Sequence, residues 1–278
     1  MMSRKRGSIG GAFYALIALI FAFGFFYPVY FTLISSFKNN NEIWNTMFSL
    51  PSSIEWNNFV SSIYEIKILR SVGNSFIFSF GATLIVILAV TMASYVISRR
   101  TLKGARGLRL FYLIGLMIPA YGMLVPVVRM FTTLGFRDMY VPMMILYAGV
   151  NFPIAFFIII NYMDGISREI DEAASIDGCG LFGTVFKVLF PICVPGVSTA
   201  GIITFLAVYN ELIFSNTLLQ KKSMQTISVT LLGLRGERFS SWGPMFACIV
   251  LSIIPILIIY ILFQNKVESG MTAGAVKG

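Results

Sequence analysis

The sequence contains no histidine, only three cysteines, and few charged side chains, which make up 12% of its 278 residues. The absence of histidine excludes histidine-based catalysis. Because Cys179, Cys193 and Cys248 are also scattered along the chain, zinc sites and a disulfide framework are not expected. Soluble domains carry about 25% charged residues. Disordered segments are poor in aromatic residues, whereas this chain has 26 Phe, 12 Tyr and 3 Trp. The composition therefore indicates a protein embedded in a membrane.

Long intervals without Lys, Arg, Asp or Glu locate the expected membrane spans, because a helix needs about 20 apolar residues to cross the hydrocarbon. Six such intervals occur, the fifth interrupted only by Glu211. Prolines lie in or beside most of them, which favours bent helices around a cavity. We expect an all-α integral membrane protein with one transmembrane domain (about 71–265) and six helices, at 10–37, 71–98, 110–128, 139–163, 196–220 and 242–265.

The basic residues predict the orientation of these spans. The densest clusters are Arg4–Arg6 and the segment from Arg99 to Arg109, and short basic segments face the cytoplasm. Lipid headgroups explain the second cluster better than nucleic acid does. The predicted segments are a cytoplasmic N-terminus at 1–9, an external loop at 38–70, cytoplasmic loops at 99–109 and 164–187, and a cytoplasmic tail at 266–278.

The external loop 38–70 is expected to fold with short helices. Its aromatic and apolar residues favour a partly packed surface over a simple linker. These residues are Trp44, Phe48, Trp56, Phe59 and Ile63.

The loop 164–187 carries five acidic residues against Arg168 and Lys187. Ser167 is a plausible N-cap for a short amphipathic helix, and Gly178 is a natural helix terminator. Connectors beside anionic lipid are usually basic. A compact acidic helix on the cytoplasmic side therefore predicts a docking site for another protein.

Within this loop, Glu172-Ala173-Ala174, three residues, Gly178, nine residues and Val188-Leu189-Phe190-Pro191 follow one another. This pattern resembles the EAA loop of permease subunits in binding-protein-dependent ABC importers, with Val188 and Phe190 in place of the usual Ile and Leu. The resemblance implies that the loop is a coupling helix held in a cleft of an ATP-binding subunit. The contact residues it implies are Glu172, Ala173, Ala174, Ser175, Asp177 and Gly178.

Several other segments narrow the resemblance to sugar-importing permeases of the maltose-permease MalG type. They are Leu50-Pro51, Asn58-Phe59, Asn74-Ser75, Tyr209-Asn210-Glu211, Phe263-Gln264 and the tail 270–278. The resemblance implies the type I permease fold, a location in the bacterial cytoplasmic membrane, and alternating access driven by ATP. It also implies three partners: a second homologous permease in a heterodimer, a dimer of ATP-binding subunits, and an extracellular sugar-binding protein.

ATP chemistry is not expected in this chain, because the sequence has no G-x-x-x-x-G-K-[ST] motif. ATP and Mg²⁺ should belong to the partner ATPase, so the chain is expected to be a transporter subunit without its own cofactor or metal. A rival interpretation, an integral-membrane enzyme, lacks any visible set of nucleophile, base or metal ligands.

Residues near the mid-span bends are candidates for the solute path, because aromatic rings stack on sugars and amides bind hydroxyl groups. Ordinary helix packing is the alternative for each of them. A lone acid within a span usually faces a bundle interior or an aqueous path. The candidates are Tyr121, Asn151, Tyr209, Asn210 and Glu211.

Two other transport functions stay open. An ABC permease for a polyol or glycerol phosphate fits the same scaffold. A secondary transporter coupled to protons or Na⁺ would use Glu211 as its coupling carboxylate.

Overall fold

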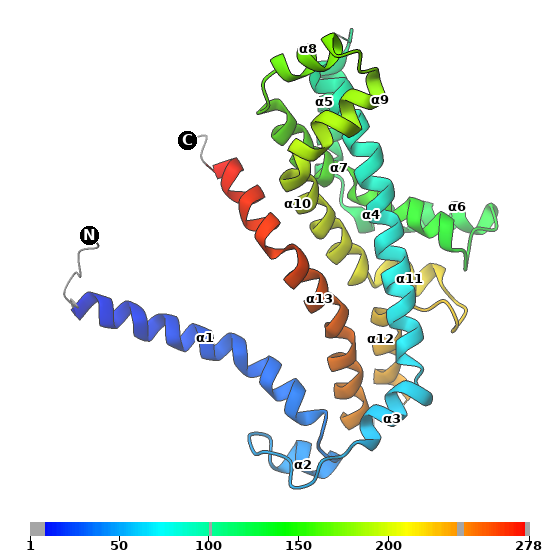
Figure 1. The fold of residues 1–278 in the computed structure, drawn as a ribbon. Helices are drawn as coiled ribbons and strands as arrows, with labels where there is room; N and C mark the ends of the chain where they lie inside the picture. The colour runs from blue at the N-terminus through cyan, green and yellow to red at the C-terminus, as the bar shows by residue number, and fades with distance from the viewer. Residues whose placement is uncertain (1–8, 100–101, 238–241, 276–278) are drawn as a thin grey trace. The chain divides into compact units, whose positions relative to one another are not determined.

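The computed structural model describes residues 9–99, 102–237 and 242–275, and within these ranges it contains helices and no strand. The basic cluster Arg4–Arg6, Arg100 of the second cluster and the last three residues of the predicted tail lie outside the described residues. The helices in chain order (Figure 1) are α1 (Ile9–Ser35), α2 (Asn40–Asn45), α3 (Asn57–Tyr64), α4 (Ile68–Arg99), α5 (Ala105–Ile114), α6 (Leu124–Thr133), α7 (Tyr140–Asp164), α8 (Glu169–Ile176), α9 (Leu181–Gly183), α10 (Phe190–Tyr209), α11 (Ile213–Leu218), α12 (Ile227–Glu237) and α13 (Trp242–Ala275).

Five of the described helical segments are long and apolar enough to cross a membrane. A sixth span results if two helices that meet at a sharp bend are counted together. The chain is therefore an all-helical membrane protein, as its composition predicts. The segments are Phe13–Ser35, Ile68–Arg99, Tyr140–Asp164, Leu181–Tyr209 and Trp242–Leu262, and the bent pair is Ala105–Met117 with Ala120–Thr133.

The chain divides into two compact units. The small unit holds the described residues up to Ile68 together with Gly233–Ile253, and the large unit holds Leu69–Leu232 together with the described residues from Ile254 onward. In the small unit, the predicted external loop does contain two short helices, α2 and α3. The surface is partly packed, as expected: Trp44, Phe48 and Trp56 are largely exposed, yet each ring also contacts another aromatic ring of this unit.

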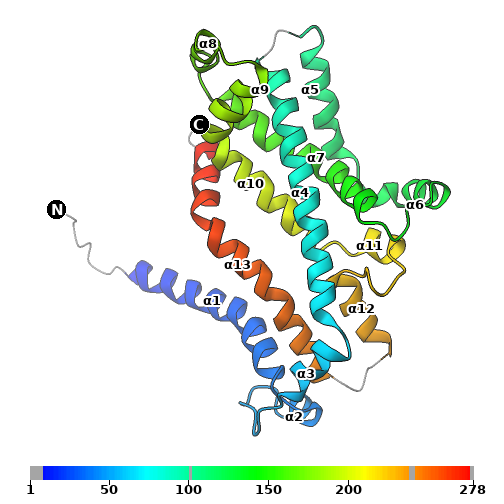
Figure 2. The same ribbon diagram turned by 45° about the vertical axis from the view of Figure 1, so that its right-hand side comes forward.

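The core of the large unit is formed by the packing of α7 against α10, with α5 also lying along α7. Gly196 of α10 permits this close approach, because a Cβ atom there would lie 2.8 Å from the ring of Tyr162. In both views α8 and α9 lie at one end of α10, and α11 lies at its other end (Figures 1 and 2).

The predicted span 110–128 is wrong as a single helix. The chain turns by 91° between Ala105–Met117 and Ala120–Thr133. Ile118 and Pro119 have extended ψ angles of 118° and 116°, because proline cannot donate a hydrogen bond and disfavours helical backbone in the residue before it.

The predicted span 196–220 is also wrong in its bounds. The helix begins at Leu181, passes through a π-helical turn at Thr184–Leu189, and ends at Tyr209. Proline is tolerated in membrane helices where the freed backbone groups find other partners, and here the π turn ends at Leu189, two residues before Pro191. Glu211 consequently lies after the helix, in the break before α11.

Candidate functional site

The acidic loop forms a short helix, α8, as its pattern predicts. Its N-cap position is Arg168 and not Ser167, although the Ser167 hydroxyl accepts a hydrogen bond from the Glu169 N–H at 3.3 Å. Three acidic residues in the first turn, Glu169, Asp171 and Glu172, suit the positive end of the helix dipole.

The end of α8 is a Schellman turn built on a glycine. The Gly178 N–H donates to the Ser175 carbonyl at 3.1 Å, and the Cys179 N–H donates to the Ala174 carbonyl at 2.9 Å. Gly178 has φ +80°, a left-handed conformation that a side chain disfavours. The turn sends the chain directly into α9.

Of the predicted contact residues, Ala174 faces inward and is buried. The side chains of Glu172, Ala173, Ser175 and Asp177 are exposed. Most of α8 is therefore exposed, and the small Ala173 side chain lets another surface approach its backbone.

Two large apolar side chains beside this face were not predicted as contacts. Ile176 is 86% exposed, and Phe182 is 67% exposed. Isolated exposed apolar residues are normal. Two of them beside an exposed helix add apolar area to this end of the large unit.

Arg99, the last residue of α4, fastens α8 to the helices behind it. Its Nη2 donates to the carbonyls of Met163 and Ile166 at 2.8 Å each, and its Nε lies 3.6 Å from the Asp171 carboxylate. The Arg99 side chain is only 4% exposed. The sequence assigned Arg99 to a lipid-facing basic loop, and that interpretation is wrong for this residue.

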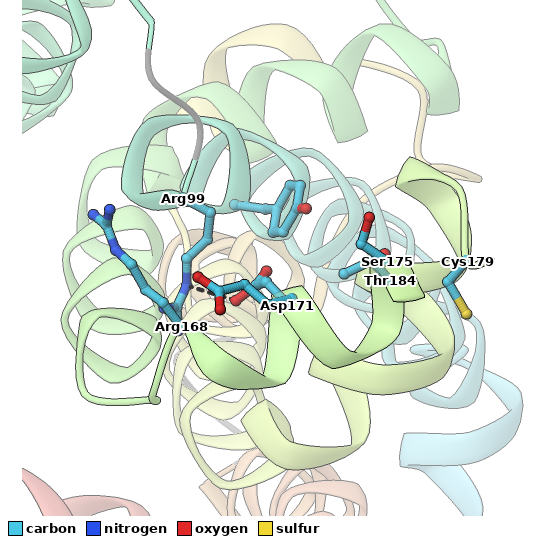
Figure 3. A pocket seen from close by; sticks show the side chains of 8 residues that line it. Arg99, Arg168, Asp171, Ser175, Cys179 and Thr184 are labelled. Carbon is cyan, nitrogen blue, oxygen red and sulfur yellow. Dashed lines mark ion pairs between the residues drawn. The ribbon is translucent and has the colours of Figure 1, made fainter. Parts of the chain in front are cut away.

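A cavity of about 270 Å³ lies between α8 and the end of α4. Figure 3 shows Arg99 and Asp171 facing each other in it, while the Cys179 sulfur points away from them. The lining residues are Tyr95, Arg99, Arg168, Asp171, Glu172, Ser175, Cys179 and Thr184.

A second basic residue also contacts this loop. Arg109 of α5 pairs with Asp164, the last residue of α7, at 2.7 Å, and both side chains are about one-third exposed. Asp164 also accepts a hydrogen bond from Ser98 of α4. The ends of α4, α5 and α7 are thus tied together beneath α8.

At the other end of α10, Glu211 joins two helices. Its carboxylate accepts hydrogen bonds from the backbone N–H groups of Phe214 and Ser215 at 2.7 and 3.0 Å, and from the Tyr147 hydroxyl at 2.9 Å. Glu211, Tyr147 and Ser215 are all buried. The carboxylate therefore caps α11 and holds it to α7. Tyr147 could not be found from the sequence, because nothing in its spacing relates it to Glu211.

The other solute-path candidates are only partly brought together. The exposed Tyr121 ring lies 5.9 Å from that of Phe214, beside the Glu211 carboxylate. Asn151 is buried and donates to the Tyr147 carbonyl, one turn earlier in α7.

Tyr209 and Asn210 lie apart from this arrangement. Tyr209 is buried with its ring stacked on Phe205 at 5.9 Å. The Asn210 amide donates to the Leu206 carbonyl of its own helix. Among the residues that the structure describes, no three His, Cys, Asp or Glu side chains are grouped to hold a metal ion.

Comparison with known proteins places this architecture in a class, the membrane components of binding-protein-dependent transport systems. Residues 16–273 match the family described as the binding-protein-dependent transport system inner membrane component, and the chain belongs to this family. It is therefore a permease component, and ATP hydrolysis belongs to other subunits. An ion-coupled secondary transporter and a membrane enzyme do not agree with this membership.

Similar proteins include the probable ABC transporter permease protein YurM of Bacillus subtilis, 31% identical over 99% of this chain and 91% of that protein. The multiple sugar-binding transport system permease protein MsmG of Streptococcus mutans is 30% identical over 90% of this chain and 91% of its own. The fold is similar to a chain in the crystal structure of a bacterial ABC transporter involved in import of the acidic polysaccharide alginate. That match has a TM-score of 0.81 and 22% identity, and covers 95% of this chain and 98% of the other.

Proposed function

We propose that this chain is one of two permease subunits in an ATP-driven importer of a sugar or oligosaccharide. Support comes from its relatives, which include a multiple sugar-binding transport system permease and a melibiose, raffinose and stachyose import permease. An external solute-binding protein and ATP-binding subunits follow from the family. A heterodimer with a homologous permease belongs to the proposal. Polyols and glycerol phosphate are the alternative solutes.

The observation that carries the proposal is the structure of the EAA segment, α8 and the turn that follows it. It is an exposed helix, closed by a Schellman turn at Gly178 and anchored from behind by Arg99. A helix of this kind suits a cleft in an ATP-binding subunit, with Glu172 and Ala173 toward the partner. Asp171 and Ala174 face the rest of this chain.

Within the proposal, docking of an ATP-binding subunit at α8 determines the orientation of the chain in the membrane. ATP-binding subunits work in the cytoplasm, so α8 and the Arg99–Arg109 segment are cytoplasmic, in agreement with the positive-inside rule. Both chain termini are then cytoplasmic, in the bacterial cytoplasmic membrane. Closure of the ATPase dimer would draw α8 inward, and the ties at Arg99 and Arg109 would carry this movement to α4, α5 and α7, opening the solute path outward.

The solute path is assigned to the region around Tyr121 and Asn151. Because both Glu211 carboxylate oxygens already accept hydrogen bonds from protein groups, we assign Glu211 a role in shaping the break between α10 and α11. Asn210 and Tyr209 contribute only if the other permease brings them to the path.

The test is affinity purification of the tagged chain from native membranes with identification of its partners. Wild type should recover an ATPase and a second permease. Glu172→Lys with Gly178→Asp should lose the ATPase and keep the permease. The matched control is Lys222→Glu, an exposed charge reversal in the loop between α11 and α12, which should keep both.

Two results would contradict the proposal. One is a wild-type chain that purifies alone and transports in liposomes without ATP. The other is undiminished ATPase recovery by the double variant. The solute class is tested separately, by measuring which sugars, polyols or glycerol phosphates the co-purified binding protein retains.

A further inference from the structure

The segment between α1 and α3, residues 39–56, exposes large apolar side chains, and we call it the cap loop. Trp44, Phe48, Leu50 and Trp56 are 64%, 74%, 68% and 62% exposed. Large exposed apolar patches on a folded segment mark a surface that contacts another protein or a membrane. The cap loop therefore needs a covering partner.

The charges of the cap loop are kept away from this surface. Residues 43–54 include no Lys, Arg, Asp or Glu. The nearest cation, Lys38, is fully buried, and its Nζ donates to the Thr46 carbonyl at 2.7 Å. Glu42 and Glu55 flank the uncharged stretch on either side. The exposed part of residues 43–54 thus presents uncharged groups: aromatic and aliphatic side chains, hydroxyl groups and the Asn45 amide.

The loop folds back along α1. The rings of Phe48 and Tyr27 lie 5.6 Å apart, and Tyr27 is eight residues before the end of α1 at Ser35. At 1.5 Å per residue this places Phe48 about 12 Å below the end of a helix that is about 40 Å long. Since the hydrocarbon is about 30 Å thick, a centred helix of this length extends about 5 Å beyond it at each end, so Phe48 lies about 7 Å inside the hydrocarbon boundary, among the upper acyl chains.

Hydrogen bonds fix the loop in this position. The Asn58 amide donates to the carbonyls of Ser36 and Lys38 at 3.0 and 2.9 Å, and the Glu55 N–H donates to the Phe37 carbonyl at 2.9 Å. These bonds satisfy carbonyl groups at and beyond the end of α1. The depth of the loop is therefore set by α1 itself. Figures 1 and 2 both show α2 beside this end of α1.

We propose that the cap loop lies in the membrane interface, with Trp44, Phe48, Leu50 and Trp56 in contact with lipid at the level of the headgroups and upper acyl chains. The loop continues the apolar surface of α1, whose span is unburied along its length. Tryptophan favours this level, because its ring is apolar and its N–H is polar. An uncharged surface beside a membrane helix is typical of contact with lipid. Surfaces that bind soluble proteins usually have a polar rim around their apolar core.

The chain offers a direct test, because its three tryptophans are Trp44, Trp56 and Trp242, all in the small unit. The chain with its co-purifying subunits is reconstituted in bilayers of ordinary or brominated phospholipid, and the variant Trp44→Phe/Trp56→Phe is treated in the same way. The difference in emission between wild type and variant separates these two residues from the tryptophans of the other subunits. Because the Trp242 ring lies 5.5 Å from that of Trp44, the comparison is repeated in a Trp242→Phe background, where no neighbouring tryptophan contributes to the difference.

We expect brominated lipid to remove most of the difference emission and aqueous iodide to leave it nearly unchanged, with the same result in the Trp242→Phe background. Quenching by iodide without quenching by brominated lipid would place the loop in water and overturn the proposal. Protection from both quenchers would show that a protein subunit covers the loop, which also overturns it. If iodide quenched the two tryptophans until the binding protein was added, the surface would belong to the binding protein, and the proposal would be wrong.

Discussion

The Nε atom of Arg99 lies 3.6 Å from the Asp171 carboxylate, while the Nη2 atom of the same guanidinium donates to the Met163 carbonyl in the last turn of α7 and to the Ile166 carbonyl just beyond it. One side chain thus joins the end of α4, the end of α7 and the inward face of α8. A force applied to α8 reaches both long helices through Arg99. We therefore expect a movement of α8 to move the ends of α4 and α7 with it.

Removing Arg99 should destabilise the protein strongly. Arg99→Ala leaves Asp171 half-buried without its cation, and breaking a buried pair from one side costs about 3–5 kcal/mol. Arg99→Lys should lose less, because it keeps the charge but cannot reproduce the planar guanidinium geometry. The measurement is thermal unfolding of the purified complex.

The neighbouring pair supplies the control for this prediction. Arg109 and Asp164 are each about one-third exposed, so Arg109→Ala should cost no more than about 1 kcal/mol. Equal melting temperatures for Arg99→Ala and Arg109→Ala would show that the burial of Arg99 does not make its ion pair more important for stability than the exposed pair.

The coupling segment shows what a sequence pattern can predict. The α8 helix and the turn at Gly178 depend on residues within one or two turns of each other, so spacing was sufficient to predict them. The partner of Asp171 could not be predicted, because Arg99 is distant in the sequence and no periodicity relates the two. Its basic neighbours made Arg99 look like one member of a lipid-facing cluster.

The fifth span shows a different limit. Charge-free intervals predict the extent of apolar sequence, whereas the helix ends where its hydrogen-bond pattern changes. The predicted span begins at residue 196, yet the π turn at Thr184–Leu189 allows the helix to start at Leu181. Glu211 was predicted as a charge inside a helix. It instead caps the next one.

At Gly178 the backbone conformation, and not the space around it, should decide the effect of a side chain. A Cβ atom at Gly178 would meet nothing within 4 Å, and the same is true at Gly180. Gly178 has φ +80°, whereas Gly180 has φ −71°. Gly178→Ala should therefore cost about 1–2 kcal/mol, and Gly180→Ala should have little effect.

Recovery of the ATPase subunit and the melting temperature of the chain are the two measurements. Gly178→Asn is a further check, because asparagine tolerates the left-handed conformation better than alanine. If Gly180→Ala proved as harmful as Gly178→Ala, contact with a partner would outweigh backbone strain at this turn.

Glu211 should prove more important for structure than for ion coupling. Glu211→Ala leaves the N–H groups of Phe214 and Ser215 buried without an acceptor. Each unsatisfied group lowers the stability of the protein by about 1–3 kcal/mol. Glu211→Gln keeps an acceptor oxygen, and Tyr147→Phe removes a single hydrogen bond to a charged group, worth about 1.5–3 kcal/mol. We expect the melting temperature to fall most in Glu211→Ala.

Solute uptake separates the two roles of Glu211. We expect ATP-dependent uptake to persist in Glu211→Gln and to fall in Glu211→Ala together with stability. Complete loss of uptake in a fully stable Glu211→Gln protein would show that the negative charge itself is needed for transport.

The exposed apolar residues beside α8 should contribute to ATPase binding without contributing to folding. Ile176 is 86% exposed, so Ile176→Ser should leave the melting temperature of the isolated chain unchanged. If the ATPase covers this side chain, burial of an Ile is worth about 1.5–3 kcal/mol, which corresponds to a loss of about tenfold or more in affinity. Phe182→Ser should behave in the same way.

Leu134, an exposed residue directly after α6, supplies the control as Leu134→Ser. Titration of the reconstituted chain with the purified ATPase subunit measures the affinities. We expect Leu134→Ser to bind as the wild type does. Unchanged binding by both Ile176→Ser and Phe182→Ser would restrict the docking surface to the polar face around Glu172 and Ala173, and the two apolar side chains would then belong with the lipid-facing surface.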